Sequence, residues 1–408
     1  MRLHPFHAWR PAAGLAPRVA APPYDVVNRA EAAELARGNP QSFLHVGRPD
    51  IDLPPETDPH DDRVYAMGRA NLERFFREGT LVRDASPGLY FYRQRWRGRT
   101  QTGIVGCVHI DDYQHDIIRK HEKTRQDKED DRTRHVLTLN AHAEPVFLAY
   151  RDTESLDRLT AAETAGSPEV EFTSDDGVTH SVWRVRDSAA LVAAFAAVRL
   201  AYVADGHHRS ASAWRAGIER RAKNPHHTGN EEYNWFLAVL FPASQLRILA
   251  YNRLVKDLRG QAPEAVLSRL SSLGSLAPVM DPVPTAPGAM AFYLDGRWHM
   301  LVIAPERINR TDPIGSLDVS LLQDLVLGPI LGVGDPRTDG RIDFVGGIRG
   351  TPELQRRVDS GEMALGVSMY PTSLEQLMSV ADAGAIMPPK STWFEPKLKS
   401  GLFVHTMD

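Results

Sequence analysis

"LAYVADGHHRSASAW", residues 200–214, is the stretch from which the fold and the function of this chain are best approached. Its first five residues are an apolar run typical of a buried β-strand. After the string D-G-H-H-R, the residues Ala211, Trp214 and Ile218 recur at the spacing of one helix face. The polar string is therefore predicted to lie at a corner where a strand passes into a helix.

The residues of this corner suit an anion. Unpaired backbone N–H groups and the helix dipole favour negative charge at a helix N-terminus. Gly206 lets the backbone approach a ligand closely, Arg209 offers a guanidinium fork, and His207 and His208 add donors or a proton carrier. We expect a phosphate site here, and the alternative is that Asp205 caps the helix beside two solvated histidines.

The composition is that of an ordinary globular protein. The chain has 408 residues, 42% of them hydrophobic, and a formal net charge of −4, so its charge balance favours neither nucleic acid nor an acidic membrane. The single cysteine, Cys107, lies in a strand-like run and is expected to be a buried thiol. The longest apolar run, 189–198, is too short to cross a bilayer, and the first residues do not resemble a signal peptide. We expect a soluble, cytoplasmic protein.

The pattern of elements predicts an α+β fold with mixed sheets, hairpins and packed helices. Asn28 has the position of a helix cap, and aromatic and β-branched runs around Gly98 are typical of a hairpin. Helices and strands alternate near the C-terminal end, as in an α/β unit. We expect an N-terminal α+β domain over 1–255 and a smaller C-terminal α/β domain over 256–408.

A second candidate segment is "RKHEKT", residues 119–124. His121, Glu122 and Thr124 can carry proton transfer, metal binding or phosphate contacts. The alternative is structural, because Thr124 and Asp127 have the spacing of a capping box at the start of a solvated helix.

The third candidate is "MPPKSTWFEPKL", residues 387–398. Two prolines stiffen a loop that can hold the ammonium of Lys390 and the hydroxyls of Ser391 and Thr392 against a ligand, and Lys397 can join them. A proline-rich surface turn accounts for the same residues equally well.

The fourth segment, "APPYDVV" (21–27), has a similar balance. Its two prolines hold an extended backbone, which presents Tyr24 and Asp25 in a fixed direction as candidate polar contacts.

Several standard sites are excluded. His121-Glu122 lacks the second histidine of a zinc-protease helix, and one cysteine cannot complete a zinc-deaminase site around "HAE" at 142–144. No nucleophile elbow occurs, and no glycine-rich dinucleotide loop follows a strand. Pro389 stands where a phosphate-binding P-loop needs glycine.

The segments "APPYDVV", "KHEKT", "YVADGHHR" and "MPPKSTWFEPKL", in this order, resemble the DUF-1015 family. "QTGIVGCVHIDDY" and "SLDVSLLQDLVL" also fit its pattern, so the resemblance covers nearly the whole chain. More distantly, "DGHHR" opening a helix is similar to the phosphate-binding corner of the ParB/sulfiredoxin fold, and to the free-serine kinases of that superfamily. This resemblance implies a ParB/sulfiredoxin-like core and ATP or ADP with Mg²⁺ as cofactor.

The resemblance also implies roles for the corner. Gly206 and Arg209 would hold phosphate, and His207 and His208 would flank the transferring group. His207 replaces the cysteine of the sulfiredoxin corner, which argues against sulfiredoxin chemistry.

We therefore hypothesise a nucleotide-dependent kinase that phosphorylates a hydroxyl of a free metabolite, with L-serine as one candidate. Asp205 would help to hold Mg²⁺ and nucleotide together with Gly206, Arg209 and the Lys390, Ser391 and Thr392 loop. The general base is left open between Glu122 and Asp25. The other contacts assigned to the substrate are Tyr24, His121, Thr124 and Lys397.

Two alternatives come from other classes of protein. The first is a nucleotide-binding regulatory or scaffold protein without turnover. The second is a metal-dependent hydrolase that uses His121, Glu122 and His207. The sequence leaves the acceptor, the nucleotide and the oligomeric state open, and it is compatible with a homo-oligomer.

Overall fold

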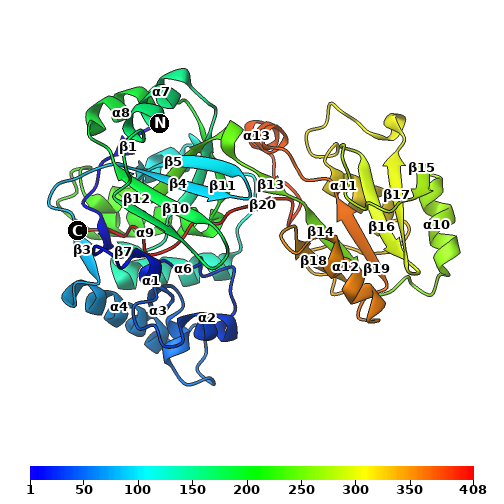
Figure 1. Ribbon diagram of the computed structural model, residues 1–408, viewed down its shortest axis with the longest axis horizontal. Coiled ribbons are helices and arrows are strands. Elements are labelled where there is room, and N and C mark those ends of the chain that lie inside the picture. The colour runs from blue at the N-terminus through cyan, green and yellow to red at the C-terminus, as the bar shows by residue number, and fades with distance from the viewer. The chain divides into compact units, whose positions relative to one another are not determined.

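The structure, a computed structural model, describes residues 1–408 and divides into two compact units (Figure 1). Unit 1 comprises residues 1–246 and 396–408, and unit 2 comprises residues 247–395. The division expected from the sequence lay at residue 255 and gave the whole C-terminal end to the second domain. In the structure, the last thirteen residues pack within unit 1 instead.

Unit 1 is built on a nine-stranded mixed sheet. Its order is β6 (Ile118–Arg119), β11 (Ala201–Asp205), β8 (Val146–Tyr150), β12 (Trp235–Pro242), β5 (Arg99–His109), β4 (Tyr90–Trp96), β10 (Thr179–Arg184) and β9 (Val170–Thr173), with β1 (Leu3–His4) also paired to β5. Two neighbouring pairs, β6 with β11 and β8 with β12, are parallel, and the others are antiparallel. The mixed α+β class predicted from the sequence is confirmed.

Helices cover this sheet, with α7 and α8 on one side and α1–α4 and α6 toward the other (Figure 1). Their bounds are α1 (Ala16–Val19), α2 (Arg29–Ala36), α3 (Leu44–Gly47), α4 (Asp62–Arg77), α5 (Ile110–Gln114), α6 (Gln126–Leu139), α7 (Glu154–Glu163), α8 (Ser188–Phe195) and α9 (His207–Lys223). Two small strand pairs complete the unit: β2 (Trp9–Pro11) with β3 (Leu81–Arg83), and β7 (Ala141–His142) with β21 (His405–Thr406).

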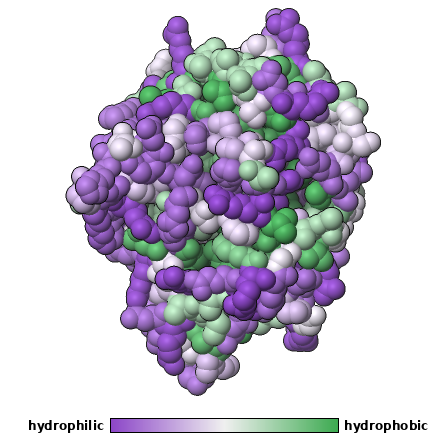
Figure 2. Space-filling model, turned by 90° about the vertical axis from the view of Figure 1, so that its left-hand side faces the viewer, coloured by the Kyte–Doolittle hydropathy of each residue, from purple (hydrophilic) through white to green (hydrophobic).

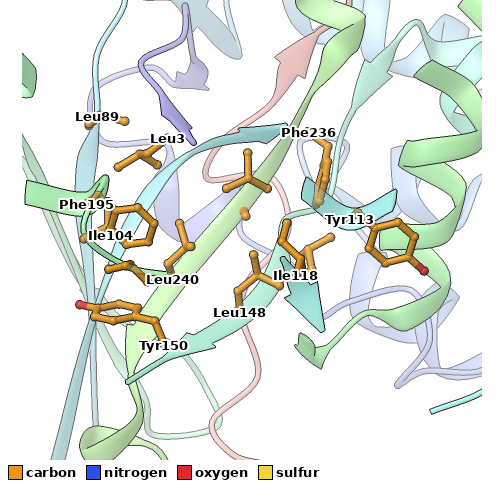
Figure 3. Packing of buried hydrophobic residues seen from close by; sticks show 14 of the residues in the cluster. Leu3, Leu89, Ile104, Tyr113, Ile118, Leu148, Tyr150, Phe195, Phe236 and Leu240 are labelled. Atoms are coloured by element: carbon orange, nitrogen blue, oxygen red, sulfur yellow. The ribbon is translucent and has the colours of Figure 1, made fainter. Parts of the chain in front are cut away.

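The main core of unit 1 lies between strands and helices that are distant in sequence. Leu3, Ile104, Leu148, Phe195 and Phe236 are almost completely buried and belong to one cluster (Figure 3). Ala211 and Ala213 of α9 pack against the same cluster, so the helix that follows the D-G-H-H-R string is anchored by apolar contacts.

Unit 2 contains a six-stranded sheet in the order β15 (Gly274–Pro278), β17 (Arg297–Ile303), β16 (Ala289–Leu294), β19 (Leu365–Met369), β14 (Tyr251–Val255) and β18 (Ile342–Gly346). A short pair joins β13 (Ile248–Leu249) to β20 (Trp393–Phe394). Its helices are α10 (Pro263–Ser271), α11 (Asp318–Leu322), α12 (Gly350–Asp359) and α13 (Leu374–Asp382), and a π-helical turn, Gln323–Leu327, follows α11.

The α/β class predicted for the C-terminal part is wrong, because every pairing in this sheet is antiparallel. The sequence β18–α12–β19 has the alternation of a parallel unit, but β14 inserts between its two strands and pairs with both. Alternation along the chain does not reveal such an inserted strand. Unit 2 is therefore α+β.

Short-range predictions agree with the structure. Asn28 caps α2 in a capping box with Glu31, and Cys107 is fully buried. The hairpin turn at Arg97 and Gly98 has positive φ at both residues, as a tight two-residue turn requires.

The surface is mixed in character. Figure 2 shows a largely hydrophilic face with hydrophobic residues in small, separate patches. None of the helices has both the length and the apolar content that crossing a membrane would require.

Candidate functional site

The corner at residues 205–209 forms where β11 ends inside the sheet of unit 1. Strand β11 lies between β6 and β8 and runs parallel to β6, with Ala201 opposite Ile118. Because the carboxyl ends of parallel strands meet at one edge, the segment after β6 and the segment after β11 come together. This topology brings the string "KHEKT" to the D-G-H-H-R string.

The start of α9 has no side-chain cap. Gly206 occupies the N-cap position with φ +95°, a conformation that other residues rarely adopt, and no side chain accepts from the first turn. The alternative interpretation, in which Asp205 caps this helix, is wrong. The first-turn N–H groups of α9 have no intrahelical acceptor and remain available to an anion.

Arg209 turns back from the first turn of α9 against Gly206. A Cβ at residue 206 would lie 3.0 Å from the Arg209 Nε, so a larger residue there would displace the guanidinium. Nη1 of Arg209 donates to the Pro145 carbonyl at 2.5 Å, and Nη2 donates to Asp205 Oδ2 at 2.9 Å. Nε is buried without a hydrogen-bond partner. Burial alone would lower the pKa of Arg209, but Asp25, Asp205 and Glu144 together raise it.

Asp205 connects the corner to the C-terminal segment. Its Oδ1 accepts from Lys397 Nζ at 3.2 Å, while Oδ2 faces Arg209. Burial would raise the pKa of Asp205, but the two cations outweigh burial and hold it well below its usual range. The carboxylate is therefore ionised throughout the physiological range, and Lys397, which the sequence assigned to the loop of Lys390, pairs with it at the corner.

A pair of buried histidines lies beside this carboxylate. The rings of His121 and His207 meet edge to face with centroids 4.4 Å apart, and both side chains are more than nine-tenths buried. Both ring nitrogens of His121 and Nε2 of His207 have no hydrogen-bond partner. Burial lowers the pKa of His121 to about 4 and that of His207 well below its usual value, so both rings are neutral near pH 7.

Glu122 and His208 complete the exposed side of the corner. Glu122 Oε2 lies 3.8 Å from His207 Nδ1, and its side chain is 47% exposed. His208 is half-buried, its Nε2 accepts from the Arg125 backbone N–H at 3.2 Å, and burial lowers its pKa.

The capping box predicted for Thr124 and Asp127 is not formed. Helix α6 begins at Gln126, and its N-cap, Arg125, has no side-chain hydrogen bond to the first turn. The Thr124 hydroxyl instead donates to Glu129.

The segment 21–27 contributes Asp25 and Tyr24. Asp25 Oδ2 lies 3.8 Å from Arg209 Nη2, so two carboxylates approach the same guanidinium nitrogen. The Tyr24 ring lies under the Arg132 guanidinium, 4.3 Å from the ring centroid, and its backbone N–H donates to Glu144 Oε1 at 3.2 Å.

Sequence reasoning missed Glu144 and Arg132. Burial raises the pKa of Glu144, and its Oε1 also accepts from Ser400 of the C-terminal segment. The string "HAE" drew attention to Glu144 only as part of a zinc motif, which a single cysteine excludes. Glu144 lies close enough to Arg209 to raise its pKa, and Arg132 contacts the Tyr24 ring, so only the folded structure relates these two residues to the site.

The comparisons with known proteins establish the family of the chain. A family model described as a protein of unknown function, DUF1015, matches residues 3–320. The chain belongs to the DUF1015 family. A search of the curated proteins finds no match to it.

Among solved structures, the chains similar to this DUF1015 protein include three at 10–13% identity. They are a free serine kinase in complex with AMP (13% identity, 74% of this chain and 91% of that chain, TM-score 0.35), a C-terminally truncated SbnI from Staphylococcus aureus (10%, 74% and 87%, TM-score 0.40) and a conserved hypothetical protein from Pyrococcus furiosus (13%, 74% and 95%, TM-score 0.34). TM-scores this low do not establish a shared fold.

The remaining predicted contacts of the DUF1015 chain, Lys390, Ser391 and Thr392, belong to unit 2. The assignment of these three residues to the nucleotide stays a prediction.

No group of three or more histidine, cysteine, aspartate or glutamate side chains is arranged to hold a metal ion by itself. His121, Glu122 and His207 are neighbours but do not form the ligand set that the hydrolase hypothesis requires. A magnesium ion bound with nucleotide needs fewer protein ligands, because it takes one or two carboxylates and completes its coordination with phosphate oxygens and water. Asp205 supplies such a carboxylate, with Asp25 beside the same arginine.

Proposed function

We propose that this protein is a nucleotide-dependent kinase that transfers a phosphoryl group to a hydroxyl of a free metabolite, for which L-serine is a candidate. One observation carries the proposal. Buried nitrogen atoms of His121, His207 and Arg209 without partners gather at an uncapped helix N-terminus. Buried polar groups are normally hydrogen-bonded, so such a concentration of exceptions points to a ligand.

The N-terminus of α9 would hold the phosphates of the nucleotide. Its free N–H groups and the dipole of a 17-residue helix attract negative charge, and Gly206 leaves room for the ligand. Arg209 Nε would add one donor without breaking the bonds of that residue to Asp205 and Pro145. His208, half-buried at the same turn, would flank the transferring group.

Magnesium would bind at Asp205 together with the nucleotide. Both oxygens of this carboxylate face cations, and the group stays ionised because Lys397 and Arg209 hold its pKa down. The ion supplies neutralisation of the charge on the phosphate oxygens.

Glu122 is the candidate that would orient or deprotonate the acceptor hydroxyl. Its carboxylate lies next to the neutral imidazole of His207 and is half exposed, so an acceptor can reach it from solvent. In the transfer, the O–H bond of the acceptor breaks and its proton passes to the carboxylate. A new O–P bond forms as the bond between the terminal phosphorus and the bridging oxygen breaks. ATP would leave as ADP, or ADP as AMP. Asp25, exposed and 3.8 Å from Arg209, is the second candidate for the base.

Three further predictions accompany this proposal. The strand–glycine–helix corner supports a ParB/sulfiredoxin-like core for unit 1, the balanced charge of the chain supports action on a small molecule, and we expect a cytoplasmic location. A homo-oligomer remains compatible with the sequence.

A phosphorus NMR screen tests the proposal. The full chain is incubated with Mg²⁺, ADP or ATP, and a pool of free amino acids that includes L-serine. We expect a new phosphomonoester signal, reduced by at least about 100-fold in Glu122→Gln. The control is Arg215→Ala, because Arg215 belongs to α9, the helix that begins at the corner, but pairs with Glu129 and Asp130. This variant should keep full turnover.

Nucleotide binding without any new phosphomonoester would overturn the kinase proposal and favour the regulatory alternative. Turnover that is unchanged in Glu122→Gln would remove Glu122 from the mechanism and leave Asp25 as the base to test.

A further inference from the structure

Unit 2 contains a buried arginine without a counter-ion. Arg253 lies on β14, inside the six-stranded sheet, and only 4% of it is exposed. Nη1 donates to the Tyr251 carbonyl and Nη2 donates to the Lys390 carbonyl at 3.0 Å, but no carboxylate pairs with this guanidinium. Burial lowers its pKa to about 10, so the group still carries its charge at neutral pH. A buried charge held only by neutral carbonyls is costly.

Lys390, an exposed residue, contributes a second positive charge beside Tyr251. Its Nζ lies 5.6 Å from the centroid of the Tyr251 ring, and it forms no ion pair. The residue has φ +57°, a left-handed conformation that is strained for a lysine. Hydrogen bonds fix the turn in this conformation: Arg253 donates to the Lys390 carbonyl, Ser391 Oγ to the Pro388 carbonyl, and Thr372 Oγ1 to the Ser391 carbonyl.

Aromatic side chains line the sheet face on which Arg253 lies. In the register of β14 and β18, Tyr251 faces Gly346 and Arg253 faces Phe344, so these four residues share one face. The Tyr251 ring meets the rings of Phe344 and Trp393 nearly edge to face, at 6.1 and 5.3 Å.

Neither Asp343 nor Glu395 forms an ion pair with Arg253 or Lys390. Asp343 alternates to the opposite face of β18 and pairs with Arg357 at 2.7 Å, and Glu395 accepts from the Trp393 indole at 2.9 Å. The cluster of Arg253, Lys390 and the aromatic side chains, which we call the Arg253 cluster, therefore carries a net positive charge.

We propose that the Arg253 cluster is a second anion site, which binds a phosphate group. Arg253 and Lys390 both contact Tyr251, and their two charges balance a phosphate dianion, whereas a single carboxylate would leave one positive charge uncompensated. The guanidinium fork suits phosphate oxygens, and the left-handed turn at Lys390 presents the ammonium near the Tyr251 ring. This site shares no residue with the corner at α9, and it goes beyond the proposed function.

Calorimetry tests the proposal by measuring the binding of inorganic phosphate to the full chain. We expect a binding component that survives in Gly206→Ala and weakens at least about tenfold in Lys390→Gly. Because glycine relieves the strain of a positive φ, Lys390→Gly should also melt at an equal or higher temperature than the wild type. Loss of binding in this variant therefore cannot come from unfolding.

Arg259→Gly is the matched control, because Arg259 is an exposed cation of unit 2 with φ +56°. Its phosphate binding should equal that of the wild type. If Lys390→Gly binds phosphate as the wild type does, or if both glycine variants weaken it equally, the site is not the Arg253 cluster.

Phenyl phosphate and benzoate identify the ligand more closely. Tighter binding of phenyl phosphate than of inorganic phosphate indicates a phosphomonoester whose ring contacts Tyr251 or Phe344, and equal binding indicates free phosphate. Benzoate that binds as tightly as phenyl phosphate would overturn the assignment of a phosphate dianion. Phosphate binding at the Arg253 cluster is measured in the Gly206→Ala variant, so the result does not depend on whether the corner at α9 is a kinase site.

Discussion

Two buried arginines, Arg209 in unit 1 and Arg253 in unit 2, have opposite surroundings. Arg209 lies among Asp205, Asp25 and Glu144, and these carboxyl groups raise its pKa against the effect of burial. Arg253 has only backbone carbonyls as partners, and burial lowers its pKa to about 10.

The difference separates two ways of preparing a site for an anion. At the corner, the charge of Arg209 is already balanced, so the ligand would gain from the free helix N–H groups and the unpartnered nitrogens. At the Arg253 cluster, the positive charge is uncompensated, so the anion itself would supply the missing counter-charge. The corner therefore holds its donor groups in a fixed geometry around the ligand, whereas the Arg253 cluster gains mainly from the charge of the bound anion.

The largest effect should come from replacing each arginine by methionine. Arg209→Met leaves the half-buried carboxylate of Asp205 without one of its two cations and the exposed Asp25 without its partner, and should lower the free energy of unfolding by about 3 kcal/mol. Arg253→Met removes an unpaired buried charge and leaves only two carbonyls without a donor, so the loss should be about 1–2 kcal/mol. Urea denaturation measures both, and equal losses would contradict the comparison.

Asp205→Asn tests whether the charge at the corner serves catalysis. The amide keeps the shape of the side chain but removes the carboxylate between Arg209 and Lys397. We expect phosphoryl transfer to fall by at least about 100-fold at saturating nucleotide. A turnover number within a few-fold of the wild type would exclude Asp205 from the site.

His121→Leu tests the neutral histidine pair. The folded state holds the pKa of His121 at about 4, below its usual 6.5, so the unfolded chain binds this proton first. The stability gained by keeping the ring neutral is present above pH 6.5 and is lost as the pH falls toward 4. This decrease in the free energy of unfolding, roughly 2–3 kcal/mol, should be absent in His121→Leu. At pH 7 the variant should be as stable as the wild type or more stable, because two unpartnered buried nitrogens are removed. Thermal melts of both proteins between pH 7 and 4 measure the difference, and parallel curves would contradict it.

The smallest effect should come from Asn28→Ala, which removes the capping box of α2 close to Asp25. We expect a loss of about 1 kcal/mol in stability and no change in turnover. A large loss of turnover would mean that the exact placement of the segment 21–27 matters more than the contacts of Asp25 suggest.

Short-range rules predicted the local structure well. The strand-to-helix corner, the cap at Asn28 and the hairpin turn at Gly98 depend on residues a few positions apart, so the sequence contains the information that decides them. The order of strands in unit 2 depends on a long-range insertion of β14, which alternation along the chain cannot reveal.

The candidate site was partly predictable. His121, Asp25 and Lys397 were proposed from separate motifs, and the parallel pairing of β6 with β11 and the return of the C-terminal segment place them beside Asp205 and Arg209. The roles of the residues stay predictions. Glu144, Arg132 and Arg253 were missed because a buried charged residue has no sequence pattern that distinguishes it from a solvated one.

The binding of ADP to Gly206→Ala is the most direct test of the central claim, that the N-terminus of α9 holds nucleotide phosphates. A Cβ at residue 206 would be strained at φ +95° and would lie 3.0 Å from Arg209 Nε. The matched control is Gly98→Ala, since Gly98 has φ +74° and no neighbouring atom within 4 Å of an added Cβ. By calorimetry, we predict that ADP binding is lost in Gly206→Ala and kept in Gly98→Ala. Equal ADP affinity in the wild type and both variants would contradict the claim.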